Sequence, residues 1–219
     1  QFGTSTITVT VSDGTATTST TFVLTVTAVN DAPTISAIAD TTTAEDTATS
    51  ALAFTIGDIE TAAADLTVTA TSSNTTLVPN TNLDFAGAGA ARTLTATPAL
   101  HQFGTSTITL TVSDATTTTS TTFVLTVTAV NDAPTAGAIA DTTTAEDTAT
   151  AALAFTISDI ETATAGLTVT ATSSNTTLVP NASLVIAGTD ANRTLTATPA
   201  SNQFGTSTIT VTVSDGTAT

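Results

Sequence analysis

The chain repeats itself with a period of 101 residues. The eight-residue sequence QFGTSTIT begins at Gln1, at Gln102 and again at Gln203. A period of this size is that of a domain, and a fixed period is typical of a linear array of similar modules. The 219 residues therefore predict one complete module between two partial ones. This organisation favours a spacer, rod or fibre over a protein with a single active site.

Polar and apolar residues alternate through most of each module, which predicts strands. In the first copy, Thr and Ser alternate with Ile and Val over residues 4–11, and Thr alternates with Phe, Leu and Val over residues 21–27. A period of two places one polar and one apolar face on a strand. Ser12-Asp13-Gly14-Thr15 lies between the two runs and predicts a hairpin turn.

The complete module contains about seven such strands and no segment with a helical period. The strands are expected at residues 35–38, 52–56, 66–70, 83–86, 93–97, 105–112 and 119–129. Seven short antiparallel strands in about 100 residues predict a sandwich of two sheets. The expected fold class is all-β, with seven-stranded sandwiches repeated in a linear array.

The sequence VNDAPT occurs twice, at residues 29–34 and 130–135, and marks the joints between modules. Proline fixes φ and restricts the preceding residue, so each joint is expected to be extended and stiff. The joints divide the chain into a hairpin with its linker (1–33), a complete module with its linker (34–134) and a module without its last strand (135–219).

Two explanations for the incomplete module remain open. The 219 residues are a window on a longer chain, or residues 18–28 of one molecule complete the last module of the next molecule. The second explanation predicts a head-to-tail fibre built by strand donation.

Composition limits what the chain can do. It has no Cys and no Lys, which excludes disulfides and Lys–Asn cross-links. The formal charge of −16 disfavours nucleic acid and anionic membranes as partners. No apolar run is long enough to cross a membrane as a helix. An acidic, Cys-free, Thr-rich tandem repeat fits a secreted or cell-surface bacterial protein.

The stretch ITVTVSDGTATTSTTFVLTVTAVNDAP resembles the end of a cadherin-like module. The whole unit is similar to the cadherin-like and immunoglobulin-like repeats of giant bacterial surface adhesins. The resemblance extends over every part of the chain, and its most specific parts are VNDAP, the AED after TTT, and the Asp-x-Glu after the second strand. It implies that calcium bound at the joints stiffens a string of sandwiches into a rod.

The resemblance also implies a set of calcium ligands at each joint. At the first joint they would be Asn30, Asp31, Asp58, Glu60 and Asp114. At the second joint Glu45 would reach from the preceding module to join Asn131, Asp132, Asp159, Glu161 and Asp215. The joint is shorter than that of animal cadherins, which favours one or two ions over three.

The residue chemistry points the same way. Calcium prefers six to eight oxygen ligands from carboxylates, carbonyls and amides, and like charges at adjoining ends repel unless a cation lies between them. Most of the acids recur in register between copies. The alternative is that these acids only form turns and keep the chain soluble.

The remaining ionisable residues offer little chemistry. His101 is the only histidine and is replaced by Asn202 in the next copy, so we expect a loop residue and no enzyme activity. Arg92 and Arg193 occupy equivalent positions, and each is expected to pair with a nearby acid.

The favoured function is a non-catalytic extracellular rod or filament whose partners are neighbouring repeats of the same or identical chains. The alternative is a recognition module for a glycan or a cell surface. That function would require exposed aromatic residues in loops that differ between copies, whereas Trp and Tyr are absent and the loops are near duplicates.

Overall fold

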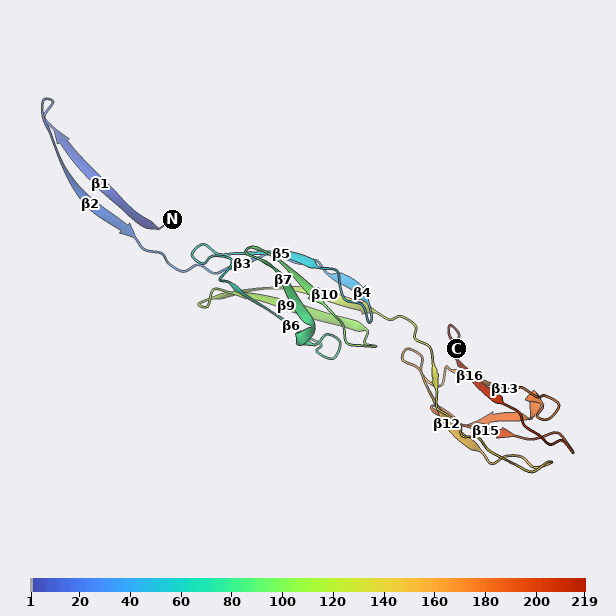
Figure 1. Cartoon of the computed structure of the whole chain (residues 1–219). Helices are drawn as coiled ribbons and strands as arrows, with labels where there is room; N and C mark the ends of the chain where they lie inside the picture. Colours follow the sequence, from blue (N-terminus) through green and yellow to red (C-terminus); the bar gives the residue numbers. More distant parts are fainter. Residues whose placement is uncertain (1) are drawn as a thin grey trace. The chain divides into compact units, whose positions relative to one another are not determined.

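A computed structural model describes residues 2–219, which form strands, turns and loops (Figure 1). The chain divides into two compact units, Gln1–Thr128 (unit 1) and Ala129–Thr219 (unit 2). The helices in the described residues are two single 3₁₀ turns, η1 (Asn80–Asn82) and η2 (Asn181–Ser183). Neither turn could span a membrane.

Unit 1 begins with a two-stranded antiparallel hairpin, as the alternating pattern predicts. Its strands are β1 (Gly3–Ser12) and β2 (Thr17–Val26), which pair along their whole length (Figure 1). The turn between them is built on Asp13, whose Oδ1 accepts hydrogen bonds from the backbone N–H groups of Ala16 at 2.7 Å and Thr15 at 2.9 Å. These bonds, with a third from the Thr15 hydroxyl, lower the pKa of Asp13 to about 2.

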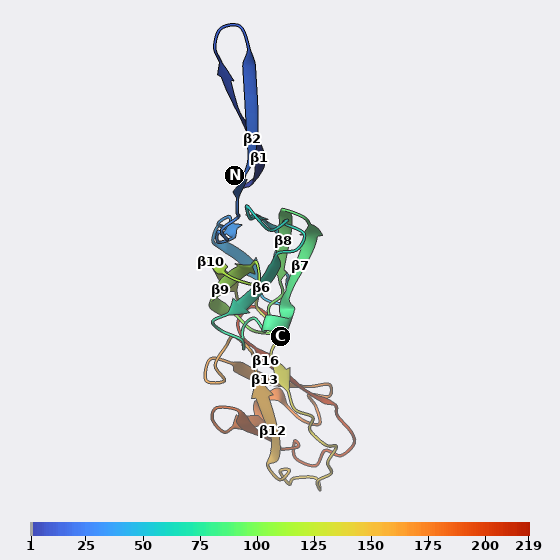
Figure 2. The same cartoon turned by 90° about the vertical axis from the view of Figure 1, so that its left-hand side faces the viewer.

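The rest of unit 1 is a sandwich of two four-stranded sheets, which confirms the expected fold class (Figure 2). The first sheet has the order β3 (Thr34–Ile35), β5 (Leu52–Gly57), β8 (Ala91–Ala96), β7 (Leu83–Ala88). The second has the order β4 (Thr41–Ala44), β10 (Thr118–Thr128), β9 (Gly104–Ser113), β6 (Thr67–Ser72).

In the two longest strands of the sandwich, β9 and β10, a row of apolar residues lies between the sheets. Ile108 and Leu110 of β9 and Leu125 of β10 are completely buried, whereas the intervening threonines face outward or lie at the margin. Burying apolar side chains is the main favourable term in folding, at about 25 cal/mol per Å². The polar–apolar alternation therefore fixes which face of each strand points inward.

The first strand of the sandwich differs from the sequence prediction. It is divided between the sheets, so that β3 pairs with β5 and β4 pairs with β10. The module consequently has eight strands, and the β4–β10 pair is parallel, whereas seven antiparallel strands were expected. Residues 41–44 have no polar–apolar alternation, and they form a strand because β10 offers an open edge.

Unit 2 repeats this topology with fewer strands. One sheet has the order β11 (Thr135–Ala136), β12 (Leu153–Ser158), β15 (Asn192–Ala197), β14 (Leu184–Ala187). The other is the pair β13 (Thr168–Ser173) and β16 (Ile209–Ser214). The buried residues of unit 1 form one cluster, whereas those of unit 2 form two separate clusters.

Candidate functional site

The acids expected at the joints gather where the linker meets the sandwich that follows it. We call this end of each unit the linker pole. In unit 1 it contains Asn30, Asp31, Asp58, Glu60 and Asp114, and in unit 2 it contains Asn131, Asp132, Asp159, Glu161 and Asp215.

Asp58 closes the turn that follows β5. Its Oδ1 accepts hydrogen bonds from the backbone N–H groups of Glu60 at 2.9 Å and Thr61 at 2.7 Å. This is the local turn that Asp forms with its own backbone two and three residues on. The Asp-x-Glu sequence therefore fixes the direction of both carboxylates, since the turn also orients the backbone of Glu60.

Asp114 closes the turn between β9 and β10 in the same way. Its Oδ1 accepts the backbone N–H groups of Thr116 and Thr117, each at 2.6 Å, and its Oδ2 accepts the hydroxyl of Thr117 at 2.9 Å. The backbone N–H of Thr117 and then the Asn30 amide are the largest causes that hold the pKa of Asp114 well below its usual range.

The linker is attached to this pole by two contacts. The side-chain amide of Asn30 donates to Oδ2 of Asp114 at 2.8 Å, and the backbone N–H of Asp31 donates to Oε2 of Glu60 at 3.0 Å. Pro33, two residues on, is fully buried. Residues far apart in the sequence thereby hold the linker in one direction where it enters the sandwich.

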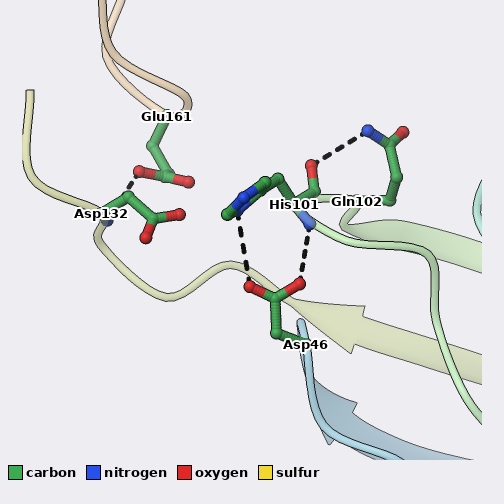
Figure 3. Close-up of polar contacts among 5 residues, drawn as sticks. All are labelled: Asp46, His101, Gln102, Asp132 and Glu161. Atoms are coloured by element: carbon green, nitrogen blue, oxygen red, sulfur yellow. Dashed lines mark hydrogen bonds and ion pairs between the residues drawn. The ribbon is translucent and has the colours of Figure 1, made fainter. Parts of the chain in front are cut away.

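Unit 2 makes the same contacts with its equivalent residues. Asn131 donates to Oδ2 of Asp215 at 2.7 Å. The backbone N–H of Asp132 donates to Oε2 of Glu161 at 2.9 Å (Figure 3). Asp159 closes the equivalent turn. The pKa of Asp215 is lowered, first by the backbone N–H groups of Ala218 and Thr217 and then by the Asn131 amide.

Some carboxylate oxygens at the poles are buried without a hydrogen-bond partner. They are Oδ2 of Asp58 in unit 1, and Oδ2 of Asp159 and Oε1 of Glu161 in unit 2. Buried charged oxygens are usually paired or bound to a metal ion, because desolvation is costly otherwise. These atoms fit a cation that prefers oxygen ligands.

The side chains do not form a closed cage of acids. Among residues 2–128, no three Asp, Glu or His side chains bring ligand atoms within 4.8 Å of one another, and the same holds for residues 129–219 taken alone. A cation at either pole would therefore also need carbonyl, amide or water oxygens, as calcium commonly does.

The predicted ligands in unit 1 do not all lie at the same end of the unit. Glu45 lies away from the linker pole of unit 1, since its backbone N–H donates to the carbonyl of Thr128 at the end of β10. Its side chain is buried, with 3% of its surface exposed. Asn30 and Asn131 reach the poles through their amide nitrogens, so the structure gives them a hydrogen-bonding role, and their role as calcium ligands stays a prediction.

His101 lies in a loop and is engaged with an acid. Its backbone N–H donates to Oδ1 of Asp46 at 2.7 Å, and its Nδ1 lies 3.4 Å from Oδ2 of the same residue (Figure 3). Its φ is 55°, in the left-handed region that Asn also tolerates well. Asn202 has the same conformation and donates its backbone N–H to Asp147, which explains why the two residues are interchanged.

The expectation that each arginine pairs with an acid is wrong, because the guanidinium groups of both arginines donate to backbone carbonyls. Arg92 donates instead to the carbonyls of Gly87, Gly89 and Ala63. Arg193 donates to the carbonyl of Thr164 at 3.4 Å. Neither arginine therefore pairs with a carboxylate of a linker pole.

Sequence reasoning missed Thr117, which donates its hydroxyl to Asp114 at the unit 1 pole. No sequence signal identifies this residue, because the equivalent position in unit 2 is Ala218, which uses its backbone N–H alone.

Comparison with protein families gives one match: residues 131–219 match the model described as "Bacterial Ig domain". Comparison with curated protein sequences gives no match.

Several solved structures are similar at low sequence identity. The extracellular cadherin domains 1–4 of protocadherin gamma B7 are 15% identical, with 96% of this chain and 56% of that chain covered and a TM-score of 0.45. The titin domains Z1Z2 in complex with telethonin are 13% identical, with 84% and 95% covered and a TM-score of 0.37. An endo-fucoidan hydrolase of glycoside hydrolase family 107 is 20% identical, with 99% and 32% covered and a TM-score of 0.36.

The chain thus spans about a third of the hydrolase and just over half of the protocadherin fragment. All three TM-scores lie below 0.5. The chain has an Ig-like sandwich fold, and residues 131–219 have the sequence pattern of a bacterial Ig domain.

Proposed function

We propose that this chain is part of a non-catalytic extracellular rod of Ig-like modules, and that calcium at the linker poles stiffens its joints. One observation carries the proposal: the same two contacts attach the linker to its module in both copies. Asn30 with Asp114 and Asn131 with Asp215 are one pair of equivalents. Asp31 with Glu60 and Asp132 with Glu161 are the other.

A linker held in this way transmits force and direction to its sandwich. Pro33 restricts the backbone beside the contact, and its burial ties the linker to the core. Inside the module the load would pass through β9 and β10, which pair over ten residues each. A spacer needs only these properties, and the near-identical copies supply them at each joint.

Calcium would reduce the repulsion at the poles. Asp31, Asp58, Glu60 and Asp114 carry four negative charges at one end of unit 1, and no described ion pair neutralises them. When bound, the ion would bridge carboxylates of the linker and the module. In unit 2 the equivalent ligands would be Asp132, Asp159, Glu161 and Asp215. The unpartnered oxygens of Asp58, Asp159 and Glu161 support this assignment.

The carboxylate of Glu45 would join the second joint only by reaching from the preceding module. Its participation, the cell-surface location and the bacterial source are parts of the proposal that the sequence resemblance supports. The match of residues 131–219 to a bacterial Ig domain agrees with that location and source.

The test is calcium titration of the 219-residue protein, with NMR shifts of the pole residues as the readout. We expect saturable shifts at Asp58 and Asp159 with a dissociation constant of about 10⁻⁴–10⁻³ M, the range of extracellular calcium modules. At a calcium concentration 100 times this constant, the protein should gain about 2.7 kcal/mol of unfolding free energy for each site.

The variant Asp58→Asn with Asp159→Asn should lose this response, because an amide oxygen is neutral and binds calcium more weakly. Asp84→Asn is the matched control, since Asp84 is an exposed acid on β7, outside the poles. Small-angle scattering should show a shorter or more flexible particle after EDTA is added. Equal scattering with and without calcium, together with unshifted pole resonances, would disprove the cation joint.

A further inference from the structure

Unit 2 carries a shallow polar groove on the outer face of its four-stranded sheet, which has the same strand order as its counterpart in unit 1. The groove runs over β12 and β15, between residues 137–138 after β11 and residues 188–190 before β15. Its volume of about 680 Å³ lies within the range of about 300–1,000 Å³ that is usual for small-molecule sites. We call it the sheet groove.

The two copies of the module differ where this groove lies. Residues 67–80 recur unchanged at 168–181, whereas the sequence GAGAA at 87–91 becomes GTDAN at 188–192. The near identity of the copies therefore fails at this loop, and each change there replaces a small residue by a polar one that lines the groove. The replacements are Ala88 by Thr189, Gly89 by Asp190 and Ala91 by Asn192.

A fourth change, at Gly137, opens the other side of the groove. In unit 1 the hydroxyl of Ser36 accepts the backbone N–H of Thr55 at 2.9 Å. The backbone has the same place in unit 2, because the N–H of Gly137 donates to the carbonyl of Thr156 as that of Ser36 does to Thr55. Gly137 has no hydroxyl, so the N–H of Thr156 lacks this acceptor. A Cβ at position 137 would lie only 2.8 Å from the Thr156 hydroxyl, so a side chain there would narrow the groove.

The polar side chains of the groove are available to a ligand. Thr156, Asp190 and Asn192 are exposed. Within the part of the chain that the structure describes, their side chains take part in no hydrogen bond or ion pair. A hydroxyl, a carboxylate and an amide together offer both donors and acceptors. The small residues Ala138 and Ala154 lie beside them in the lining.

The charge of the groove disfavours an anionic ligand. Arg193 pairs directly with Phe155, which is buried in the core, and opposite residues of an antiparallel pair share a face. The Arg193 side chain therefore lies on the inner face of the sheet, where it donates to the carbonyl of Thr164. A phosphate or carboxylate in the groove would meet Asp190 without a cation. A neutral ligand with many hydroxyl groups matches the mixed donors and acceptors.

We propose that the sheet groove of unit 2 binds a neutral saccharide of one or two hexose units, and that the equivalent face of unit 1 does not. Asp190, Asn192 and the backbone N–H of Thr156 would bind its hydroxyl groups, and the small residues would contact its C–H groups. The inference goes beyond the rod function and does not depend on calcium. A shallow groove without an aromatic side chain to stack on a sugar implies a dissociation constant on the order of 1 mM.

The experiment follows backbone amide signals of the 219-residue protein by NMR in EDTA. D-glucose, D-galactose and D-mannose are each added to about 20 mM, well above the expected constant. We expect at least one of these hexoses to shift the signals of Thr156 and Asn192 with saturation. Thr55 and Ala91, the equivalent residues of unit 1, are the internal control and should not shift. The anionic sugar N-acetylneuraminic acid should shift none of the four signals.

Unit 1 supplies variants that should keep the fold. Asp190→Gly with Asn192→Ala restores the unit 1 residues and should weaken binding at least tenfold. Gly89 and Asp190 both have a left-handed φ, 61° and 52°, so the exchange suits the backbone. Val185→Asp also restores a unit 1 residue, but Val185 lies on β14 outside the groove, so this matched control should bind normally.

The reverse exchange transfers the site to unit 1. A variant with unit 2 residues at the four changed positions should show saturable shifts at Thr55. Its substitutions are Ser36→Gly, Ala88→Thr, Gly89→Asp and Ala91→Asn.

The absence of a saturable shift with all three hexoses would overturn the proposal. Equal shifts at Thr55 and Thr156 in the parent protein would indicate a solvent effect and would also overturn it. Unchanged affinity in the loop variant, or no gain of binding in unit 1, would show that the four positions do not form the site. Binding of N-acetylneuraminic acid alone would contradict a neutral ligand. The calcium response of the pole variants bears only on the rod function, so the two proposals fail separately.

Discussion

The side-chain amide of Asn30 donates a hydrogen bond of 2.8 Å to Oδ2 of Asp114, 84 residues further along the chain. Asn131 repeats this contact with Asp215 at 2.7 Å. In both copies the acceptor also closes a turn, which joins β9 to β10 in unit 1 and follows β16 in unit 2. One carboxylate therefore links the shape of that turn to the direction of the incoming linker, and the predictions below concern this end of the unit and the core beneath it.

Low pH should weaken the hydrogen bonds that Asp114 and Asp215 accept. The pKa of Asp114 and Asp215 is lower in the folded protein than its usual value near 3.9, so their contribution to stability is complete above about pH 4. The contribution is lost as the pH falls from there toward the folded pKa. The double variant Asp114→Asn with Asp215→Asn should be less stable at pH 7 and should lose less unfolding free energy than the parent protein between pH 4 and pH 2.

Circular dichroism in urea measures this difference at each pH, since the chain has no Trp or Tyr for fluorescence. Asp84→Asn, an exposed acid on β7, is the control for the change in net charge. Parallel acid profiles for the double variant and the parent protein would contradict the assignment.

The turn between β9 and β10 contains a strained alanine. Ala115 has a φ of 76°, whereas Gly14 and Gly216, its equivalents in the other copies, have φ values of 94° and 96°. Left-handed backbone favours glycine, so Ala115→Gly should stabilise unit 1 by about 1 kcal/mol. Gly216→Ala should destabilise unit 2 by a similar amount. Calorimetry should show opposite shifts of the melting temperature, and shifts of the same sign would contradict the argument.

The role of Arg92 depends on its planar guanidinium group, which donates to three carbonyls from Gly87, Gly89 and Ala63. A lysine ammonium cannot reproduce this fork, so Arg92→Lys should cost about 1–2 kcal/mol of unfolding free energy.

The matched variant is Arg193→Lys in unit 2. Arg193 makes one such hydrogen bond, at 3.4 Å, and its Nη1 is buried without a partner. Arg193→Lys should therefore cost less than about 0.5 kcal/mol of unfolding free energy. Urea unfolding of both variants provides the comparison, and an equal cost would show that the carbonyl contacts of Arg92 contribute little.

Equivalent isoleucines should differ in their contribution to stability because they are buried to different degrees. Ile108 is completely buried, whereas Ile209 is half-buried. Ile108→Ala should cost about 2–5 kcal/mol, the usual range for a buried residue that leaves a cavity. Ile209→Ala should cost less than about 2 kcal/mol, because less apolar surface is lost from burial.

Amide hydrogen exchange in β9 and β16 reports on the two units separately. An equal loss of protection in both variants would contradict this argument.

The period, the strands and the turns follow from the sequence alone. Alternation of Thr with Ile, Val, Leu and Phe is enough to fix which face of β9 or β10 is buried once a sandwich forms. Asp13, Asp58 and Asp114 close turns with their own backbone, and this is a local interaction that needs no distant partner. The acids at the joints were named from the family resemblance of the VNDAP and Asp-x-Glu sequences.

The arginine partners could not be predicted in this way. Formal charge indicates that the guanidinium group of Arg92 should seek an acid, but the fold brings three carbonyls to it. The contact between Asn30 and Asp114 was likewise fixed only by the path of the intervening strands, because 84 residues separate the two partners.

Two pairs of identical sequences differ in structure because their tertiary surroundings differ. TTSTTFVLTV forms a strand in both places, yet Phe22 is 54% exposed and Phe123 is 2% exposed. TTTA is a strand at 41–44 and is not one at 142–145. Local propensity is the same within each pair, so the difference comes from the surroundings. Phe123 is covered by a second sheet, and residues 41–44 lie beside the edge of β10. Burial and edge pairing are properties of the surrounding fold, which a short sequence does not contain.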